Sequence, residues 1–221
     1  MAARLTAANK TAAAMASAKR KATDVEKTAS APKKPFGHWS QGLLASMDDP
    51  ELRVDADDKV VIIKDKYPKA RHHFLILPKQ KIASLRSLKK DHLELLEHVH
   101  KKGEELAKKT CDKLNFRLGY HAIPSMSHLH MHVISQDFDS PSLKNKKHWN
   151  SFTTEYFVDS KDIIKRLKED GKVDFDSSKF QDILKRPLKC HVCKKDFSTI
   201  PSLKTHIKLH VTDGSVEKKA D

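Results

Sequence analysis

The sequence predicts an α+β fold with a mainly antiparallel sheet, followed by a small zinc-binding module. Three observations lead to this prediction. Short β-branched runs are separated by turns, one long amphipathic pattern lies between two pairs of such runs, and a Cys-x2-Cys and His-x3-His arrangement stands near the C-terminal end. The 221 residues are enough for one medium domain and a small accessory module.

Residues 1–35 are expected to be a disordered basic tail, because they are rich in Ala, Lys, Ser and Thr and offer little for a core to bury. They carry eight Lys and Arg against two acids and end in a breaker-rich stretch. The basic clusters at residues 19–21 and 33–34 favour a split nuclear-import signal. The absence of acids before Asp24 also fits a mitochondrial transit peptide, and a plain electrostatic tail is the third alternative.

The strands of the main domain are predicted from β-branched and aromatic runs. Residues 60–63, Val-Val-Ile-Ile, predict a buried strand, and residues 72–77 predict the next strand after a turn at residues 66–70. Two further strands are expected at residues 116–121 and 130–135. Their order along the chain favours antiparallel pairing.

The main domain as a whole is expected over residues 36–170, with two helices. The first begins near Asp91 and runs for about five turns, because apolar residues recur there at intervals of three or four. Those residues are Leu88, Leu95, Leu96, Val99 and Leu106. A polar, Lys-rich stretch follows at residues 140–149, and the second helix is expected near residues 160–169.

Three segments are expected after the main domain. Residues 171–186 are interpreted as a linker, and residues 187–212 as the zinc-binding module. Residues 213–221 are expected to be a disordered tail.

His128, His130 and His132 alternate with apolar residues, so on a strand the three imidazoles would share one face. Three aligned imidazoles repel one another if they are charged and desolvated, and a bound phosphate would relieve that repulsion. Exposed strand histidines, a metal site and nucleophilic attack by histidine on a phosphoryl centre are the three interpretations. The metal site is disfavoured because no carboxylate or fourth ligand stands beside the histidines.

The stretch His128-Leu129-His130-Met131-His132-Val133-Ile134 resembles the His-Φ-His-Φ-His-Φ-Φ signature of the histidine-triad nucleotide hydrolases and transferases, in which Φ is an apolar residue. Residues 65–70, 121–127 and 135–140 extend the resemblance to the branch of this family that removes adenylate from DNA ends. The resemblance covers about residues 36–210 and implies a histidine-triad fold.

The resemblance implies roles for four catalytic histidines. His130 would attack the α-phosphorus of the adenylate and form a covalent histidine–AMP intermediate, while His128 and His132 would hold the phosphate oxygens. His73 matches the family's residue for protonating the leaving 5′-phosphate. Neutral imidazole is nucleophilic near pH 7, so two successive displacements are chemically reasonable.

The resemblance also implies the substrate contacts. Asp65 falls where relatives bind the adenosine ribose, and Lys69 would contact the DNA end. Trp39 matches an aromatic residue that stacks at the exposed end of the duplex. The residues expected to line the phosphate path are His121, Ser125 and Ser127.

The arrangement Cys190-x2-Cys193-x12-His206-x3-His210 has the ligand spacing of a Cys2His2 zinc finger. Phe197 and Leu203 stand where such a finger keeps its small core. We therefore predict a ββα finger that holds one structural Zn2+ through these four residues, with no open position for catalysis.

The finger is expected to grip the DNA backbone without reading sequence. The three helix positions that read bases in other fingers hold Thr199, Ser202 and Thr205, none of which makes a bidentate base contact. Its lysines, Lys204 among them, suit backbone phosphates. The alternative is a finger that supports the catalytic domain or binds protein.

Between the two modules, Lys144, Lys147 and Trp149 form a basic bridge that, on the resemblance, would follow the DNA backbone. The chain carries 43 Lys and Arg against 29 Asp and Glu, a net charge of +14 that favours polyanionic partners. The lone third cysteine, Cys111, argues against a disulfide framework and for a reducing compartment. No apolar run is long enough to cross a bilayer, so we expect no membrane partner.

The predicted function is therefore a nuclear DNA-repair hydrolase that removes AMP from 5′-adenylated double-stranded DNA at a nick or end. RNA–DNA junctions and 3′-guanylated ends are further substrates that the resemblance implies. One alternative is a general histidine-triad hydrolase of adenosine phosphoramidates or dinucleoside polyphosphates, and another is a non-catalytic DNA-binding adaptor. Many animal members carry a forkhead-associated domain before the catalytic part, and 35 residues are too few to form one, so binding to phosphopeptide scaffolds is not expected.

Overall fold

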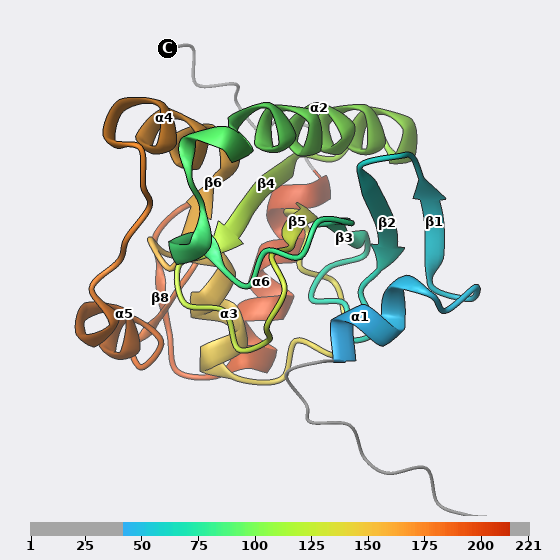
Figure 1. Ribbon diagram of the computed structural model, residues 1–221. Helices are drawn as coiled ribbons and strands as arrows, with labels where there is room; N and C mark the ends of the chain where they lie inside the picture. Colours follow the sequence, from blue (N-terminus) through green and yellow to red (C-terminus); the bar gives the residue numbers. More distant parts are fainter. Residues whose placement is uncertain (1–41, 213–221) are drawn as a thin grey trace, which may run out of the picture. The chain divides into compact units, whose positions relative to one another are not determined.

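The computed structural model describes residues 42–212. Trp39, the basic N-terminal segment and the C-terminal tail lie outside the described residues. Six strands form one sheet in which all neighbouring strands are antiparallel, and two short strands form a separate hairpin (Figure 1). In spatial order the six strands are β1 (Arg53–Ala56), β2 (Val60–Lys64), β3 (His73–Pro78), β5 (Met131–Ser135), β4 (Phe116–His121) and β6 (Phe157–Asp159). The predicted α+β fold is confirmed.

Both faces of the sheet are covered by other parts of the chain, and this explains why four successive residues of β2 are apolar. Val60 and Ile62 belong to one core cluster, whereas Val61 and Ile63 belong to another. Because successive side chains of a strand point to opposite faces, a run of four buried residues requires a core on each side. Burial of each such side chain stabilises the fold by about 1.5–3 kcal/mol.

One face is covered by two helices and the other by a short one. On the first face lie α2 (Leu93–Thr110) and α4 (Ser160–Asp170), both close to the predicted positions. On the second face lies α1 (Gly42–Met47), which the sequence pattern did not predict and which contributes Leu43 to the core there. Figure 1 shows α2 running across the sheet beside α4. Two single turns of 3-10 helix, Leu85–Ser87 and Lys90–His92, precede α2.

The polar stretch before residue 150 contains a helix, α3 (Lys146–Thr153). Its start is fixed by Asn145, whose side-chain oxygen accepts a hydrogen bond from the backbone N–H of His148 at 2.9 Å. Its buried face consists of Trp149, Asn150 and Phe152. A buried asparagine in this face breaks the apolar period, and for that reason the helix was not predicted.

The segment expected to be a linker is ordered and packed. It contains α5 (Ser177–Ile183), which is capped by the carboxylate of Asp176 accepting from the backbone N–H of Ser178 at 3.0 Å. Val173 and Phe175 are 2% and 7% exposed and belong to the same core cluster as the α2 and α4 side chains. Residues 171–186 are therefore packed onto the main domain through a few buried side chains, and the linker prediction is wrong.

The C-terminal module has the predicted ββα order, with strands β7 (Leu188–Lys189) and β8 (Asp196–Phe197) and helix α6 (Ile200–Thr212). Its apolar residues share one continuous core cluster with side chains of the main domain. From the module come Leu188, Cys190, Ile200, Leu203 and Ile207, and from the main domain Ala70, Ile134, Phe138, Leu143, Trp149, Phe152 and Phe157. The finger is thus packed against the main domain through an apolar interface. Within residues 42–212, no helix combines the length and apolar character of a membrane span.

Candidate active site and zinc-binding module

Three adjacent strands bring the histidines together. In the strand register, His132 on β5 lies opposite Leu75 on β3 and Gly119 on β4. His73 and His121 stand two residues away from those partners, so they lie on the same face as His132. Ring centroids are 5.2 Å apart for His73 and His132, 4.5 Å for His121 and His132, and 5.0 Å for His130 and His132.

The strand prediction for the triad needs one correction. β5 begins at Met131, so His128 and His130 precede the strand. His128 has a left-handed backbone with φ 76, a conformation that is uncommon for a residue with a Cβ atom. Its Nε2–H donates to the carbonyl of Pro78 at 2.7 Å, which pins this residue against the end of β3. Strict alternation along one strand therefore does not describe all three histidines.

His130 has the protonation state that a nucleophile requires. Its Nδ1 lies 2.8 Å from the carbonyl oxygen of His128, so Nδ1 must carry the hydrogen. Burial lowers the pKa of His130 below its usual value, although the same hydrogen bond partly opposes this shift. A neutral ring whose hydrogen is on Nδ1 presents the Nε2 lone pair, which is the reactive form.

A second hydrogen-bonded chain fixes the tautomer of His132. The backbone N–H of Lys69 donates to Nδ1 of His73 at 3.1 Å, so the neutral His73 ring carries its hydrogen on Nε2. That Nε2 lies 2.9 Å from Nδ1 of His132, which must then be the acceptor. The hydrogen of His132 is therefore on Nε2, a buried atom without a partner among the described residues. Nε2 of His121 is likewise buried and unpartnered.

The cluster is electrically neutral near pH 7 because it is buried. Desolvation lowers the pKa of His73 to about 4, that of His121 to about 3, and that of His132 well below its usual value. Mutual repulsion among the histidines and the charge of Lys69 act in the same direction. The unpartnered Nε2–H of His132 can therefore donate a hydrogen bond to an anionic ligand.

Asp65 and Lys69 lie on the loop between β2 and β3, beside His73. The Asp65 carboxylate accepts from the backbone N–H of Tyr67 at 2.7 Å, and its other oxygen lies 3.5 Å from Nδ1 of His73. Lys69 donates its ammonium to the carbonyl of Tyr67, and burial lowers the pKa of Lys69. The Asp65 side chain therefore reaches the histidine cluster, whereas Lys69 reaches it through its backbone N–H. No described contact assigns either residue a ligand, and their roles at the ribose and the DNA end remain predictions.

Ser125 and Ser127 line a cavity of about 240 Å3 between the segments 83–86 and 122–127. A smaller cavity, lined by His121, His128 and His130, shares Ser84, Leu85 and Pro124 with it. The cavity beside the two serines thus adjoins the cavity beside the triad. That the serines line the phosphate path remains a prediction.

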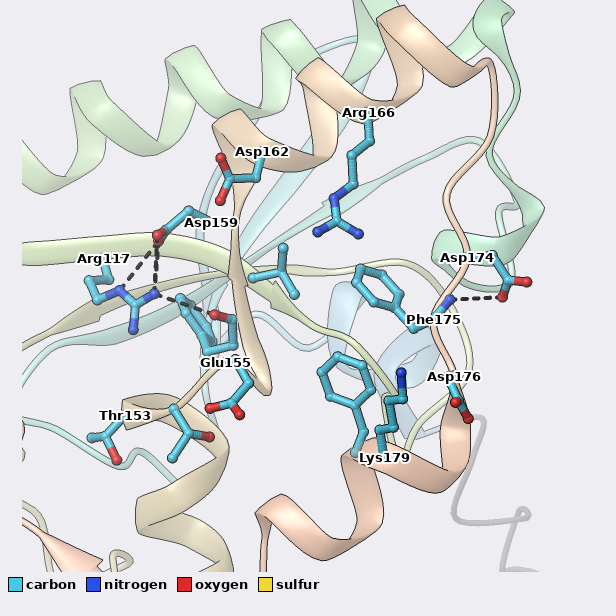
Figure 2. Close-up of a pocket in the computed structure, with 14 residues that line it drawn as sticks. Arg117, Thr153, Glu155, Asp159, Asp162, Arg166, Asp174, Phe175, Asp176 and Lys179 are labelled. Carbon is cyan, nitrogen blue, oxygen red and sulfur yellow. Dashed lines mark hydrogen bonds and ion pairs between the residues drawn. The ribbon is translucent and has the colours of Figure 1, made fainter.

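A larger cavity lies elsewhere, and no triad histidine lines it. It has a volume of about 760 Å3 and is bounded by β6, α4 and the segment around α5 (Figure 2). Arg117 forms an ion pair with Asp159 at 3.1 Å, and the guanidinium of Arg166 stacks over Phe175. One guanidinium is thus paired with a carboxylate and the other with an aromatic face, and we assign no chemistry to this cavity.

The basic bridge separates into exposed and buried residues. Lys144 and Lys147 are exposed, which is consistent with a role at a polyanion. Trp149 is fully buried at 0% exposure, and its Nε1–H donates to the carbonyl of Lys189 at 2.9 Å. The prediction that Trp149 contacts DNA is therefore wrong, because its ring packs between the main domain and the finger.

Lys204 is half-buried, and its ammonium donates to the carbonyl of Ser140 at 2.6 Å.

The four predicted zinc ligands converge. The ligand atoms of Cys190, Cys193, His206 and His210 all lie within 4.8 Å of one another. Cys193 Sγ lies 3.1 Å from Nε2 of His206, and the two histidine Nε2 atoms are also 3.1 Å apart. Ligands at about 2.0–2.3 Å from one zinc ion in a tetrahedron are separated by distances of about this size, so the donor set fits zinc.

Comparisons with known proteins agree with this site. Residues 38–148 match the family described as scavenger mRNA decapping enzyme C-term binding, and residues 153–213 match the C2HE / C2H2 / C2HC zinc-binding finger. Aprataxin of Danio rerio is 60% identical over 177 residues, which cover 79% of this chain and 54% of that protein. The chain thus spans about half the length of this relative.

Two shorter relatives are covered almost completely. The aprataxin-like protein of Saccharomyces cerevisiae is 35% identical, with 77% of this chain and 95% of that protein aligned. A crystal structure described as the aprataxin ortholog Hnt3 in complex with DNA superposes with a TM-score of 0.66 at 26% identity. That superposition covers 80% of this chain and 96% of the other.

Proposed function

Because this chain belongs to the aprataxin family of histidine-triad proteins, we propose that it is a DNA-repair hydrolase that releases AMP from 5′-adenylated DNA. The observation that carries the proposal is the geometry of His130, whose Nδ1 is held by a backbone carbonyl and whose buried ring is neutral. The crystal structure of a relative described as a complex with DNA supports DNA as the partner.

The reaction would proceed in two displacements at one phosphorus atom. Nε2 of His130 attacks the α-phosphorus of the adenylate, an N–P bond forms, and the P–O bond to the 5′-phosphate breaks. Water then attacks the same phosphorus, the N–P bond breaks, and its electron pair returns to Nε2. The water loses a proton, and the products are AMP and DNA with a 5′-phosphate.

The neighbouring histidines would stabilise the charge that moves onto the phosphate oxygens. The unpartnered Nε2–H of His132 is a donor for one oxygen. The Nε2–H of His128 is held by the carbonyl of Pro78, so His128 would have to release that hydrogen bond to donate to another oxygen. His73 keeps its proposed part in protonating the leaving phosphate. Since both its nitrogens are engaged, it would act through His132 or give up one of these hydrogen bonds first.

The remaining predicted contacts surround this centre. Asp65 would bind the ribose, and Lys69 would meet the DNA end at the half-buried loop where its ammonium lies. Ser125 and Ser127 would line the phosphate path through the adjoining cavity. 5′-Adenylated RNA–DNA junctions and 3′-guanylated ends present the same kind of phosphoanhydride, and we include them as further substrates.

The finger would contribute binding and stability. A structural zinc ion held by the four converging ligands would cross-link the β7–β8 hairpin to α6. Lys144 and Lys147 would contact backbone phosphates, so we expect affinity for DNA to fall with added salt. We propose a nuclear location for this activity, with the mitochondrion as the alternative.

The proposed covalent intermediate provides a direct test. The protein is mixed with a duplex whose nick carries a 5′-adenylate, quenched within milliseconds, and analysed by mass spectrometry for a chain heavier by one AMP. The adduct should map to His130 and be absent from His130→Asn. An adduct on another residue would contradict the assigned nucleophile, and an adduct formed only with dinucleoside polyphosphates would favour the small-nucleotide alternative.

A further inference from the structure

Residues 137–140, which we call the bridging segment, lie between the β2–β3 loop and the finger. Asp137, Phe138 and Ser140 are only 6%, 0% and 3% exposed. Phe138 has a left-handed backbone with φ 48, which is costly for a residue with a Cβ atom and persists only where the surroundings fix it. The segment is therefore held in one conformation by contacts on both sides.

On one side the bridging segment holds the β2–β3 loop. The Asp137 carboxylate accepts from the backbone N–H of Arg71 at 3.0 Å. The Ser140 hydroxyl donates to the carbonyl of Pro68 at 2.5 Å and accepts from the backbone N–H of Ser142 at 3.1 Å. Two points of the loop, on either side of Lys69, are thus tied to this segment.

On the other side the finger holds the bridging segment. The ammonium of Lys204, on α6, donates to the carbonyl of Ser140 at 2.6 Å. The Phe138 ring packs edge-on against Trp149 and His191, with centroid distances of 4.9 Å and 5.0 Å. A charged donor that is half-buried on a carbonyl forms a strong hydrogen bond, because water competes poorly for it.

The β2–β3 loop matters for catalysis because its backbone sets the tautomers of the histidines. The N–H of Lys69 donates to His73, and His73 in turn holds His132. A shift of the loop would weaken the first of these hydrogen bonds. The Nε2–H of His132 would then no longer be fixed toward the phosphate.

We infer that Lys204 is a positioning residue for the β2–β3 loop. Through this residue the finger affects the rate of the chemical step as well as the affinity for DNA. The inference rests on the proposed function for its kinetic part. The effect of Lys204 on the rate should therefore also be seen with adenosine substrates that are too small to reach the finger. A lysine that served only backbone phosphates would affect DNA substrates alone.

The test compares Lys204→Met with Lys208→Met, since Lys208 is exposed one turn further along the same helix. Turnover is measured on a small adenosine phosphoramidate with a fluorescent leaving group. Lys204→Met should lower kcat roughly fivefold to tenfold with little change in KM, because a small displacement of catalytic groups costs rate more than binding. Lys204→Arg should restore most of kcat, and Lys208→Met should match the wild type.

Ser140→Ala provides a second variant outside the finger, and zinc content shows whether each variant keeps its folded finger. Ser140→Ala should lower kcat on its own, and the double variant with Lys204→Met should be no slower than the slower single one, because both cut the same link. Unchanged kcat in Lys204→Met, or fully additive losses in the double variant, would overturn the inference.

Hydrogen exchange separates this inference from the proposed function. In Lys204→Met the amide of Lys69 and its loop neighbours should exchange faster than in the wild type and in Lys208→Met, whether or not the chain releases AMP. Unchanged exchange at these amides would overturn the coupling. A wild-type chain that released no AMP from any substrate would count against the proposed function alone, and the exchange result would still decide the coupling.

Discussion

Replacement of Trp149 by Phe tests whether this residue holds the finger to the main domain. The indole is fully buried, and its Nε1–H is hydrogen-bonded to the carbonyl of Lys189. Phe removes that donor and leaves the carbonyl of this part-buried hydrogen bond without it, at a cost of about 1–2 kcal/mol. The smaller ring also leaves a void that adds about 1 kcal/mol. We therefore expect a loss of about 2–3 kcal/mol in the free energy of unfolding.

The assay is thermal and urea unfolding of Trp149→Phe beside Tyr67→Leu, which changes an aromatic side chain that is 54% exposed. The stability loss corresponds to a fall in Tm of about 4–12 °C for a domain of this size. Tyr67→Leu should change the unfolding free energy by less than about 0.5 kcal/mol. If Trp149→Phe unfolded like the wild type but bound DNA much more weakly, the buried role assigned to Trp149 would be refuted.

Three further predictions follow from the titrating groups, the zinc ligands and the basic bridge. The pKa of His73 is lowered from its usual 6.5 to about 4, so the unfolded chain binds more protons between these values and the native state loses stability as the pH falls. From pH 7 to pH 5 this group alone should cost about 2 kcal/mol, and urea unfolding of His73→Gln should show a shallower pH dependence. A wild type equally stable at both pH values would contradict the buried neutral histidine. Cys193→Ala should lose the one zinc ion per chain, measured by atomic absorption, whereas Cys111→Ala should keep it; retention of zinc by Cys193→Ala would remove this residue from the ligand set. Lys144→Ala and Lys147→Ala should each reduce the slope of log affinity for DNA against log salt by about 1, and unchanged slopes would place the DNA elsewhere.

The elements with a clear hydrophobic period could be predicted from the sequence. The run at residues 60–63 and the pattern that begins after Asp91 appear as β2 and α2, because each buries apolar side chains at the spacing of its own secondary structure. Helix α3 has a buried asparagine in its apolar face, and α5 has seven residues that start at a side-chain cap. Neither helix has a hydrophobic period by which its sequence could be distinguished from that of a loop.

The candidate site could be predicted in its residues but not in its connections. The spacing of two motifs predicted two separate sets of residues from the sequence. One set is the triad His128, His130 and His132, and the other is the four zinc ligands. The position of His121 and His73 beside His132 depends on the strand register, and the burial of Trp149 depends on how the finger packs. Contacts between segments far apart in the chain leave no local pattern, and the link from Lys204 to Ser140 is of this kind.

Release of AMP from a 5′-adenylated nicked duplex tests the central claim most directly. Wild type is compared with His130→Ala and His130→Asn, with a dinucleoside polyphosphate as a parallel substrate. The account predicts rapid release of AMP from DNA by the wild type, with loss of at least about three orders of magnitude in both variants, because the nucleophile is absent. Undiminished release by His130→Asn, or release from the dinucleoside polyphosphate alone, would contradict it.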